Sequence, residues 1–185
     1  MLLLMGELEM KKMGQNTHSH ATGRAQYVNH HRQLNDDYDA LSLTLTEDAA
    51  SGLIYLIEEE KMARDLYDAF AEQTGSLIFE RISDSEQQHL DALLMVADAA
   101  GIDVPELLEQ PGTFHNPTIQ NLYNTLLEQG SVSFAEAIAV GIAVEETDIY
   151  DLQQLLPETE ISLLGVVYSN LLAGSQNHLA AFESF

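Results

Sequence analysis

Glu86 and His89 are the first residues in this sequence whose types and spacing could bind a metal. They are three positions apart, so in a helix both side chains project from the same face. The carboxylate of such a Glu-x-x-His pair can bridge two ions while the imidazole holds one of them. Because Glu and His fall three apart by chance in many helices, the pair needs partners from other helices before it indicates a site.

Candidate partners lie within three other apolar stripes of helical spacing. Glu60 is centred on the first stripe, and Glu59 is its rival in a neighbouring register, with Glu60 favoured as the ligand. Burying several carboxylates in one core is costly, and cations are the usual compensation. The predicted metal ligands are therefore Glu60, Glu86, His89, Glu145, Asp148 and His178.

The composition limits the chemistry of any such site. The chain has no cysteine, which excludes disulfides, Cys-ligated zinc, iron–sulfur clusters and thiol nucleophiles. A tightly bound transition metal would need nitrogen and oxygen ligands. The combination of His with Asp or Glu suits iron, manganese or zinc.

The charge distribution bears on partners and location. Residues 33–185 hold three of the seven Lys and Arg residues and 28 of the 30 acids, a net charge of 3 − 28 = −25. Such a surface repels nucleic acid and anionic membrane. No apolar run approaches the roughly 18 residues of a membrane span, and Met1–Met5 lack the basic leader of a signal peptide. We expect a cytoplasmic protein without nucleic-acid or membrane partners.

The pattern predicts a tail over residues 1–44 and a helical domain over residues 45–185. The tail shows no sustained period, and its histidines are at most loose ligands. Beyond it, apolar spacing predicts four long helices and a short one between the second and third: 46–74, 77–100, 118–128, 133–156 and 161–182. Two hairpins joined by one long crossover describe an all-α, ferritin-like antiparallel four-helix bundle.

The order of ligands along these helices fits the same architecture. Ferritin-like carboxylate sites take a Glu from each of two helices and a Glu-x-x-His from each of the other two. Here the first and third long helices offer Glu60 and Glu145, and the second offers the Glu86 pair. The fourth offers Ser175-x-x-His178, in which Ser replaces Glu.

The segment Glu60-Lys61-Met62-Ala63-Arg64-Asp65-Leu66-Tyr67 resembles the first-helix motif of rubrerythrins, a ligand Glu followed by Ala-Arg and then Tyr. Residues 46–183 as a whole resemble a rubrerythrin-related family of uncharacterised prokaryotic proteins. The resemblance implies the ferritin-like fold and a homodimer, but no settled activity.

Two departures from rubrerythrins affect the predicted chemistry. Without a Cys-rich rubredoxin module, any redox cycle needs an external electron donor. With Ser175 in place of Glu, three carboxylates remain where an ordinary di-iron site has four. Asp148, one turn from Glu145, would restore the count. The alternatives are that water or hydroxide replaces the missing ligand, or that only one metal binds tightly.

The leading functional hypothesis is an oxidoreductase with two iron ions, or iron and manganese, that reduces peroxide or oxygen. Glu86 would bridge the ions. Glu60 and His89 would hold one ion, Glu145 and His178 the other, and Tyr67 and Tyr150 would donate hydrogen bonds to the carboxylates. The alternatives are ferrous iron capture, ferroxidation or storage, and a bundle whose metal is structural or lost and which serves as an interaction module.

Overall fold

The computed structural model describes residues 43–104, 106–156 and 163–185, and none of them lies in a strand. The predicted all-α class is confirmed. The described helices are α2 (Glu47–Thr74), α3 (Leu77–Ala100), the short 3₁₀ helix η1 (Glu106–Glu109), α4 (Pro117–Gly130), α5 (Phe134–Leu155) and α6 (Leu163–Phe182). The predicted tail, apart from residues 43 and 44, and the first two residues of the predicted fourth long helix lie outside the described residues.

Local capping fixes the ends of α2. The Thr46 side chain accepts a hydrogen bond from the Ala49 amide at 3.1 Å, as the sequence predicts for an N-cap. At the other end Gly75 adopts a left-handed conformation with φ of 66°, which favours glycine, and its amide donates to the Ala71 carbonyl at 2.8 Å. The connection to α3 is therefore only Gly75 and Ser76, and the two helices are antiparallel.

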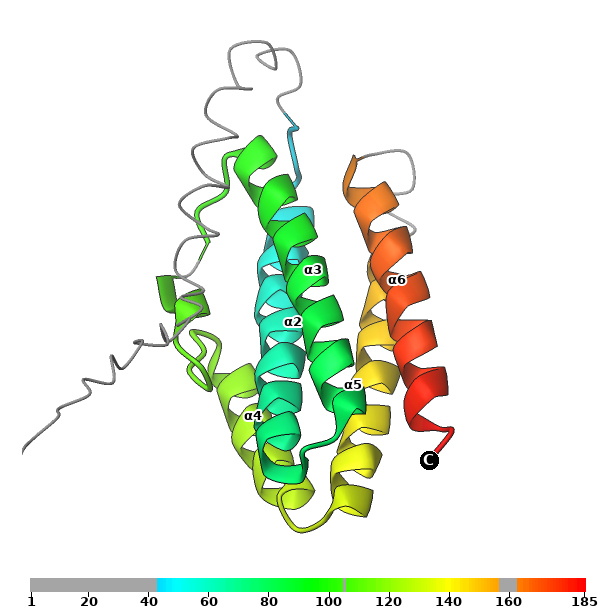
Figure 1. Cartoon of the computed structure of the whole chain (residues 1–185). Coiled ribbons are helices and arrows are strands. Elements are labelled where there is room, and N and C mark those ends of the chain that lie inside the picture. The colour runs from blue at the N-terminus through cyan, green and yellow to red at the C-terminus, as the bar shows by residue number, and fades with distance from the viewer. Residues whose placement is uncertain (1–42, 105, 157–162) are drawn as a thin grey trace, which may run out of the picture. The chain divides into compact units, whose positions relative to one another are not determined.

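The four long helices pack side by side (Figure 1). α2 contacts α3, α5 contacts α6, and the two hairpins meet through α3 with α6 and α2 with α5. The segment after α3, together with α4, returns the chain to the end at which α3 began. α4 packs against α2 and α5. None of the helices in the described part of the chain is long and apolar enough to cross a membrane.

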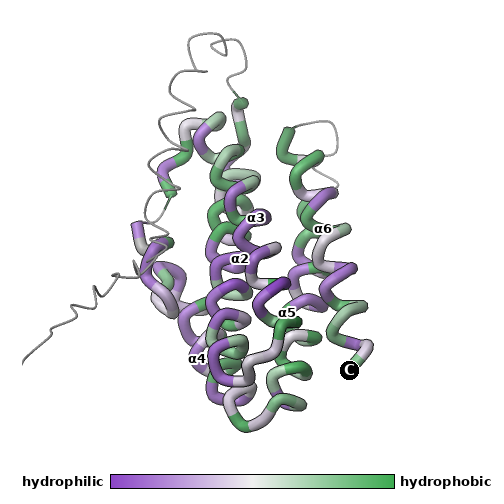
Figure 2. Tube along the Cα trace, in the orientation of Figure 1, coloured by the Kyte–Doolittle hydropathy of each residue, from purple (hydrophilic) through white to green (hydrophobic). Residues whose placement is uncertain are grey.

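Two apolar clusters fill the core, one toward each end of the long helices. One is centred on Tyr67, Phe70, Phe79 and Phe182, and the other contains Leu53, Leu56, Leu90, Leu93, Leu164 and Tyr168. Figure 2 shows hydrophilic residues along the middle of α2 and α3, between more apolar stretches. The polar side chains buried there include the predicted ligands.

The buried charges of α2 fall into two groups, and one group anchors the crossover. Lys61 is 1% exposed, pairs with Asp65, donates to the Gln110 carbonyl at 2.8 Å and lies 4.2 Å from the centroid of the Phe114 ring. Arg64 also pairs with Asp65, at 2.8 Å. The buried cations on this side of α2 are therefore compensated within the protein.

Backbone amides of the crossover complete this anchor. The Gly112 amide donates to Asp65 and the Asn116 amide donates to Glu58, each at 2.8 Å. Arg64 reaches the Leu108 carbonyl at 3.2 Å and the Gln87 side chain of α3 at 2.6 Å. Lys61, Arg64 and Asp65 of the motif that resembles rubrerythrins thus hold the connection between the two hairpins.

We expect Asp65→Ala to lower the free energy of unfolding by about 3–5 kcal/mol, because it leaves Lys61 buried without its carboxylate partner. Chemical denaturation of the full chain measures the change. Glu72→Ala, at an exposed position of the same helix, is the control and should change stability by no more than about 0.5 kcal/mol. Equal effects of the two substitutions would contradict the anchoring role of the pair.

Candidate metal centre

Four helices bring the predicted ligands into one buried layer. Glu60 comes from α2, Glu86 and His89 from α3, Glu145 and Asp148 from α5, and His178 from α6. Their exposed fractions run from 1% for Glu86 and Glu145 to 9% for His89. Each lies on an inward face because it falls at helical spacing from core residues on its own helix.

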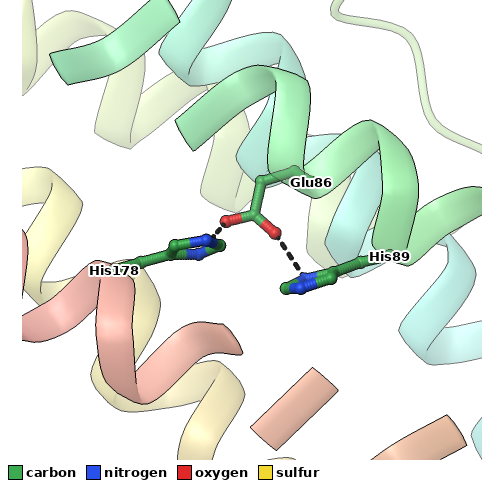
Figure 3. Close-up of side chains that lie close together, drawn as sticks. All are labelled: Glu86, His89 and His178. Atoms are coloured by element: carbon green, nitrogen blue, oxygen red, sulfur yellow. Dashed lines mark ion pairs between the residues drawn. The ribbon is translucent and has the colours of Figure 1, made fainter. Parts of the chain in front are cut away.

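Glu86 lies between the two imidazoles at the centre of this layer (Figure 3). Its Oε2 is 2.8 Å from Nδ1 of His89, and its Oε1 is 2.8 Å from Nδ1 of His178. The two rings are stacked, with centroids 5.3 Å apart and an angle of 25° between their planes. One carboxylate thus presents a separate oxygen to each imidazole.

Two further carboxylates flank this arrangement, one beside each histidine. Glu60 Oε2 lies 3.2 Å from Nδ1 of His89, and Glu145 Oε2 lies 3.5 Å from Nδ1 of His178. Tyr67 donates a hydrogen bond to Glu145 Oε1 at 2.7 Å. The structure therefore brings together the predicted pair Glu60 and His89, the predicted pair Glu145 and His178, and the predicted Tyr67.

Several polar atoms of the layer are buried without a hydrogen-bond partner. They include Glu60 Oε1, Glu86 Oε1, Asp148 Oδ1 and His178 Nδ1. His178 Nδ1 is within ion-pair distance of Glu86 Oε1, but the direction of the ring nitrogen does not meet the requirement of a hydrogen bond. Unmade hydrogen bonds of buried polar groups are costly. Glu86, His89 and His178 each offer one ligand atom, and these atoms lie within 4.8 Å of one another, close enough to hold a metal ion.

The electrostatics of the layer reflect the concentration of negative charge. Burial and neighbouring carboxylates raise the pKa of Glu60 well above its usual range and that of Glu145 to about 8. Burial likewise raises the pKa of Asp148 to about 7. In the absence of cations, protons must therefore compensate part of the charge.

The central group behaves in the opposite way. Burial alone would raise the pKa of Glu86, but the close imidazoles of His178 and His89 outweigh burial and bring it down to about 2. Burial would lower the pKa of His178, but Glu145 and Glu86 outweigh burial and raise it to about 10. Glu86 is therefore the carboxylate of the layer whose negative form its neighbours stabilise most.

A small internal pocket contains one residue that the sequence analysis did not choose. Its lining consists of the side chains of Glu59, Glu60, Ala63, Glu86, Val144, Glu145 and Asp148. Glu59 is 2% exposed, so Glu59 and Glu60, the two alternatives for the ligand on α2, are both buried. The two histidines are not in the lining because they lie on the α3 and α6 side of Glu86.

Ser85 and Gly174 position the two imidazoles, and no pattern in the sequence indicated either role. The Ser85 hydroxyl lies 2.9 Å from Nε2 of His178, so that the other ring nitrogen, Nδ1, faces Glu86 and Glu145. A Cβ at Gly174 would lie 2.4 Å from Nε2 of His89, so only glycine permits this approach. The α6 backbone thus supports the His89 ring directly.

Ser175 and Asp148 interact with each other, whereas Tyr150 takes no part in the site. The Ser175 hydroxyl donates to Asp148 Oδ2 and orients that carboxylate. Tyr150 is 61% exposed, so the prediction that it donates to the buried carboxylates is wrong. It is five residues from Glu145, which rotates it by about 140° around the helix.

The chain matches the family model described as "Uncharacterized protein domain (DUF2202)" over residues 49–184. The chain belongs to the DUF2202 family. A relative, "Uncharacterized protein MJ0754" of Methanocaldococcus jannaschii, is 38% identical over 138 residues, which cover 75% of each chain. The crystal structure of hypothetical protein MJ0754 matches with a TM-score of 0.73 and 37% identity, over 76% of this chain and 80% of that chain. The DUF2202 description states neither a fold nor a reaction, so the likeness to rubrerythrins stays a prediction.

We expect Gly174→Ala to displace the His89 ring in this DUF2202 chain. Replacing Gly by Ala in a helix interior ordinarily stabilises by about 1 kcal/mol, but here the added methyl meets the imidazole and should lower stability by roughly 1–3 kcal/mol. Gly52→Ala is the matched control, because its Cβ would meet only the flexible tip of Leu155, at 3.0 Å. Thermal or chemical unfolding compares the two variants, and a stabilised Gly174→Ala protein would contradict the close approach.

Proposed function

We propose that the described helices form a ferritin-like four-helix bundle that holds a dinuclear iron centre and reduces peroxide or oxygen. The order of helices supports the fold, since two antiparallel hairpins are joined by one long crossover. An iron–manganese pair is the alternative metal content. The observation that carries the proposal is the single carboxylate of Glu86 between two imidazoles, each facing its own oxygen.

The residues of the layer fit a pair of transition-metal ions. Nitrogen and oxygen donors from His, Glu and Asp suit iron and manganese. The unpartnered atoms Glu60 Oε1, Asp148 Oδ1 and His178 Nδ1 are buried donors that a cation would satisfy. Four carboxylates, Glu60, Glu86, Glu145 and Asp148, match the four positive charges of two divalent ions. Asp148 on α5 thereby supplies the charge that Ser175 on α6 lacks.

Each residue has a distinct part in this proposal. Glu60 and His89 would hold one ion and Glu145 and His178 the other, with Glu86 shared between the two and Asp148 as the additional ligand. Tyr67 orients Glu145 and Ser85 orients His178, as hydrogen-bond partners of metal ligands generally do. The two apolar clusters on either side of the layer exclude bulk water from it.

Two ferrous ions together supply the two electrons that, with two protons, convert hydrogen peroxide to two waters. The chain has no cysteine and hence no rubredoxin-type relay of its own. An external donor therefore has to return the electrons after each turnover. The protein's own contribution is to fix the ligands and to limit access of water and reductants to the buried layer.

Anaerobic titration of the metal-free protein with Fe²⁺ should end at about two ions per chain, the number proposed here on the basis of charge balance and Glu86 bridging. Addition of hydrogen peroxide should then produce the absorption of ferric carboxylate centres with about one peroxide consumed per two irons. Glu86→Ala should abolish this, because it removes the one carboxylate that the two ions share. Metal analysis and absorption spectroscopy measure the stoichiometry.

Three outcomes would contradict specific parts of the proposal. Two irons retained by Glu86→Ala would exclude the bridging role. Iron uptake that continues far beyond two per chain, with mineral formation, would favour storage over fixed-stoichiometry turnover. A melting temperature insensitive to chelators in a protein that binds no iron would favour a structural or interaction role.

Ser85→Ala should lower the affinity of the centre by roughly 10–100-fold without abolishing binding, because Nε2 of His178 loses the partner that orients the ring. Competition with a chelator of known affinity measures the change. Ser83→Ala on the same helix is the control: its hydroxyl bonds to Arg64 and Asp68 instead of to a ligand. Equal losses in both variants would indicate a general effect on α3 instead of orientation of His178.

A further inference from the structure

One buried carboxylate of the layer has no part in the proposed dinuclear centre. Glu59 is 2% exposed, lies next to Glu60 on α2 and lines the internal pocket together with Asp148 of α5. Glu59 Oε2 and Asp148 Oδ1 are both buried without a hydrogen-bond partner. Two unpartnered carboxylate oxygens from different helices thus line the same pocket.

The charge balance leaves Glu59 uncompensated. Two divalent ions are matched by Glu60, Glu86, Glu145 and Asp148, so Glu59 is a fifth negative group in the layer. Among the described residues, the Lys and Arg side chains are those of Lys61, Arg64 and Arg81. The first two bind Asp65 and the crossover, and Arg81 is exposed. No described Lys or Arg is therefore available to neutralise Glu59.

The negative charge continues from this point toward solvent. Asp151 follows Asp148 by three residues on α5 and is only partly buried. Burial raises the pKa of Glu59 well above its usual range, and the charges of Asp148 and Asp151 raise it further. Burial and the charges of Glu59 and Asp151 also raise the pKa of Tyr55, to about 12. Glu59 and Asp148 line the pocket, and the partly exposed Asp151 lies one turn beyond Asp148 on α5.

We propose that Glu59 and Asp148 form an accessory binding site for a divalent cation, on the Asp151 side of the dinuclear centre. This inference rests on the proposed function, which assigns Glu60, Glu86, Glu145 and Asp148 to the dinuclear centre, and it has Asp148 shared between that centre and the accessory ion. The accessory site offers only carboxylate oxygens, which suit hard cations such as Mn²⁺. Without an imidazole it binds more weakly than the main centre. An ion bound there would lie in the same pocket as the ligands of the dinuclear centre, next to them.

Titration of the metal-free full chain with Mn²⁺, followed by the electron paramagnetic resonance signal of free Mn²⁺, tests the site. The wild-type protein should show a tight class of ions and one weaker ion per chain. Glu59→Gln should weaken that last ion by at least about 10-fold and leave the tight class unchanged. Glu58→Gln is the matched control and should keep both classes, because Glu58 is equally buried but accepts from the Asn116 amide of the crossover.

Asp151→Asn gives a second variant at a partly exposed position, where folding is not at risk. It should weaken the last ion by a few-fold and leave the tight class unchanged. A weaker ion retained at full affinity by Glu59→Gln, or unaffected by Asp151→Asn, overturns the proposal. Loss of the tight class in Glu59→Gln also overturns it, because Glu59 would then belong to the main centre.

Failure of the proposed function gives a different pattern. If Glu86→Gln keeps the tight class, the dinuclear assignment is wrong whatever Glu59→Gln does. If Glu86→Gln loses the tight class while Glu59→Gln changes nothing, only the accessory site is wrong.

Discussion

Neutralising negative charge inside a helical core is the constraint on which the rest of this structure depends. Five carboxylates share one buried layer with two imidazoles, and the desolvation of each carboxylate disfavours its charged form. The imidazoles compensate Glu86, whose pKa falls to about 2, but the others lack an equivalent partner. Their raised pKa values show that protons or cations must supply the remaining positive charge. The apolar clusters on either side of the layer keep water from hydrating these carboxylates.

The two sides of α2 show why this deficit is specific to the layer and not a general property of an acidic chain. Toward the crossover, Lys61 and Arg64 surround Asp65, and backbone amides complete its hydrogen bonds. Toward the pocket, Glu60 and Glu59 precede Lys61 by one and two residues and have no Lys or Arg side chain beside them. The same helix therefore carries a compensated buried cluster and an uncompensated one. This contrast within one helix supports a cation as the missing partner.

Helical periodicity was sufficient to predict the helices and the inward position of the six ligands, because each lies among core residues three, four or seven positions away on its own helix. Periodicity failed where a helix is buried on more than the one face that an amphipathic pattern assumes, and where a role depends on contacts between helices. The choice between Glu59 and Glu60 presumed that α2 has one buried face, but the crossover and α5 bury it on several sides. The exposed Tyr150 was placed by proximity in sequence and not by rotation around α5. Contacts such as Ser85 with His178 and Gly174 with His89 join different helices, and no spacing within one helix encodes them.

The replacement of a fourth-helix Glu by Ser175 changes how the ligands are distributed. The Ser175 hydroxyl binds Asp148 Oδ2, so the carboxylate expected on α6 is supplied by α5, and its second oxygen is left toward the pocket. Oxygen donors then gather on α2 and α5, whereas both imidazoles lie on α3 and α6. A metal centre built in this way has a nitrogen-rich side and an oxygen-only side. In the proposed centre Glu59 and Asp151 would add carboxylates to the oxygen-only side, where a hard cation would meet negative charge and no histidine.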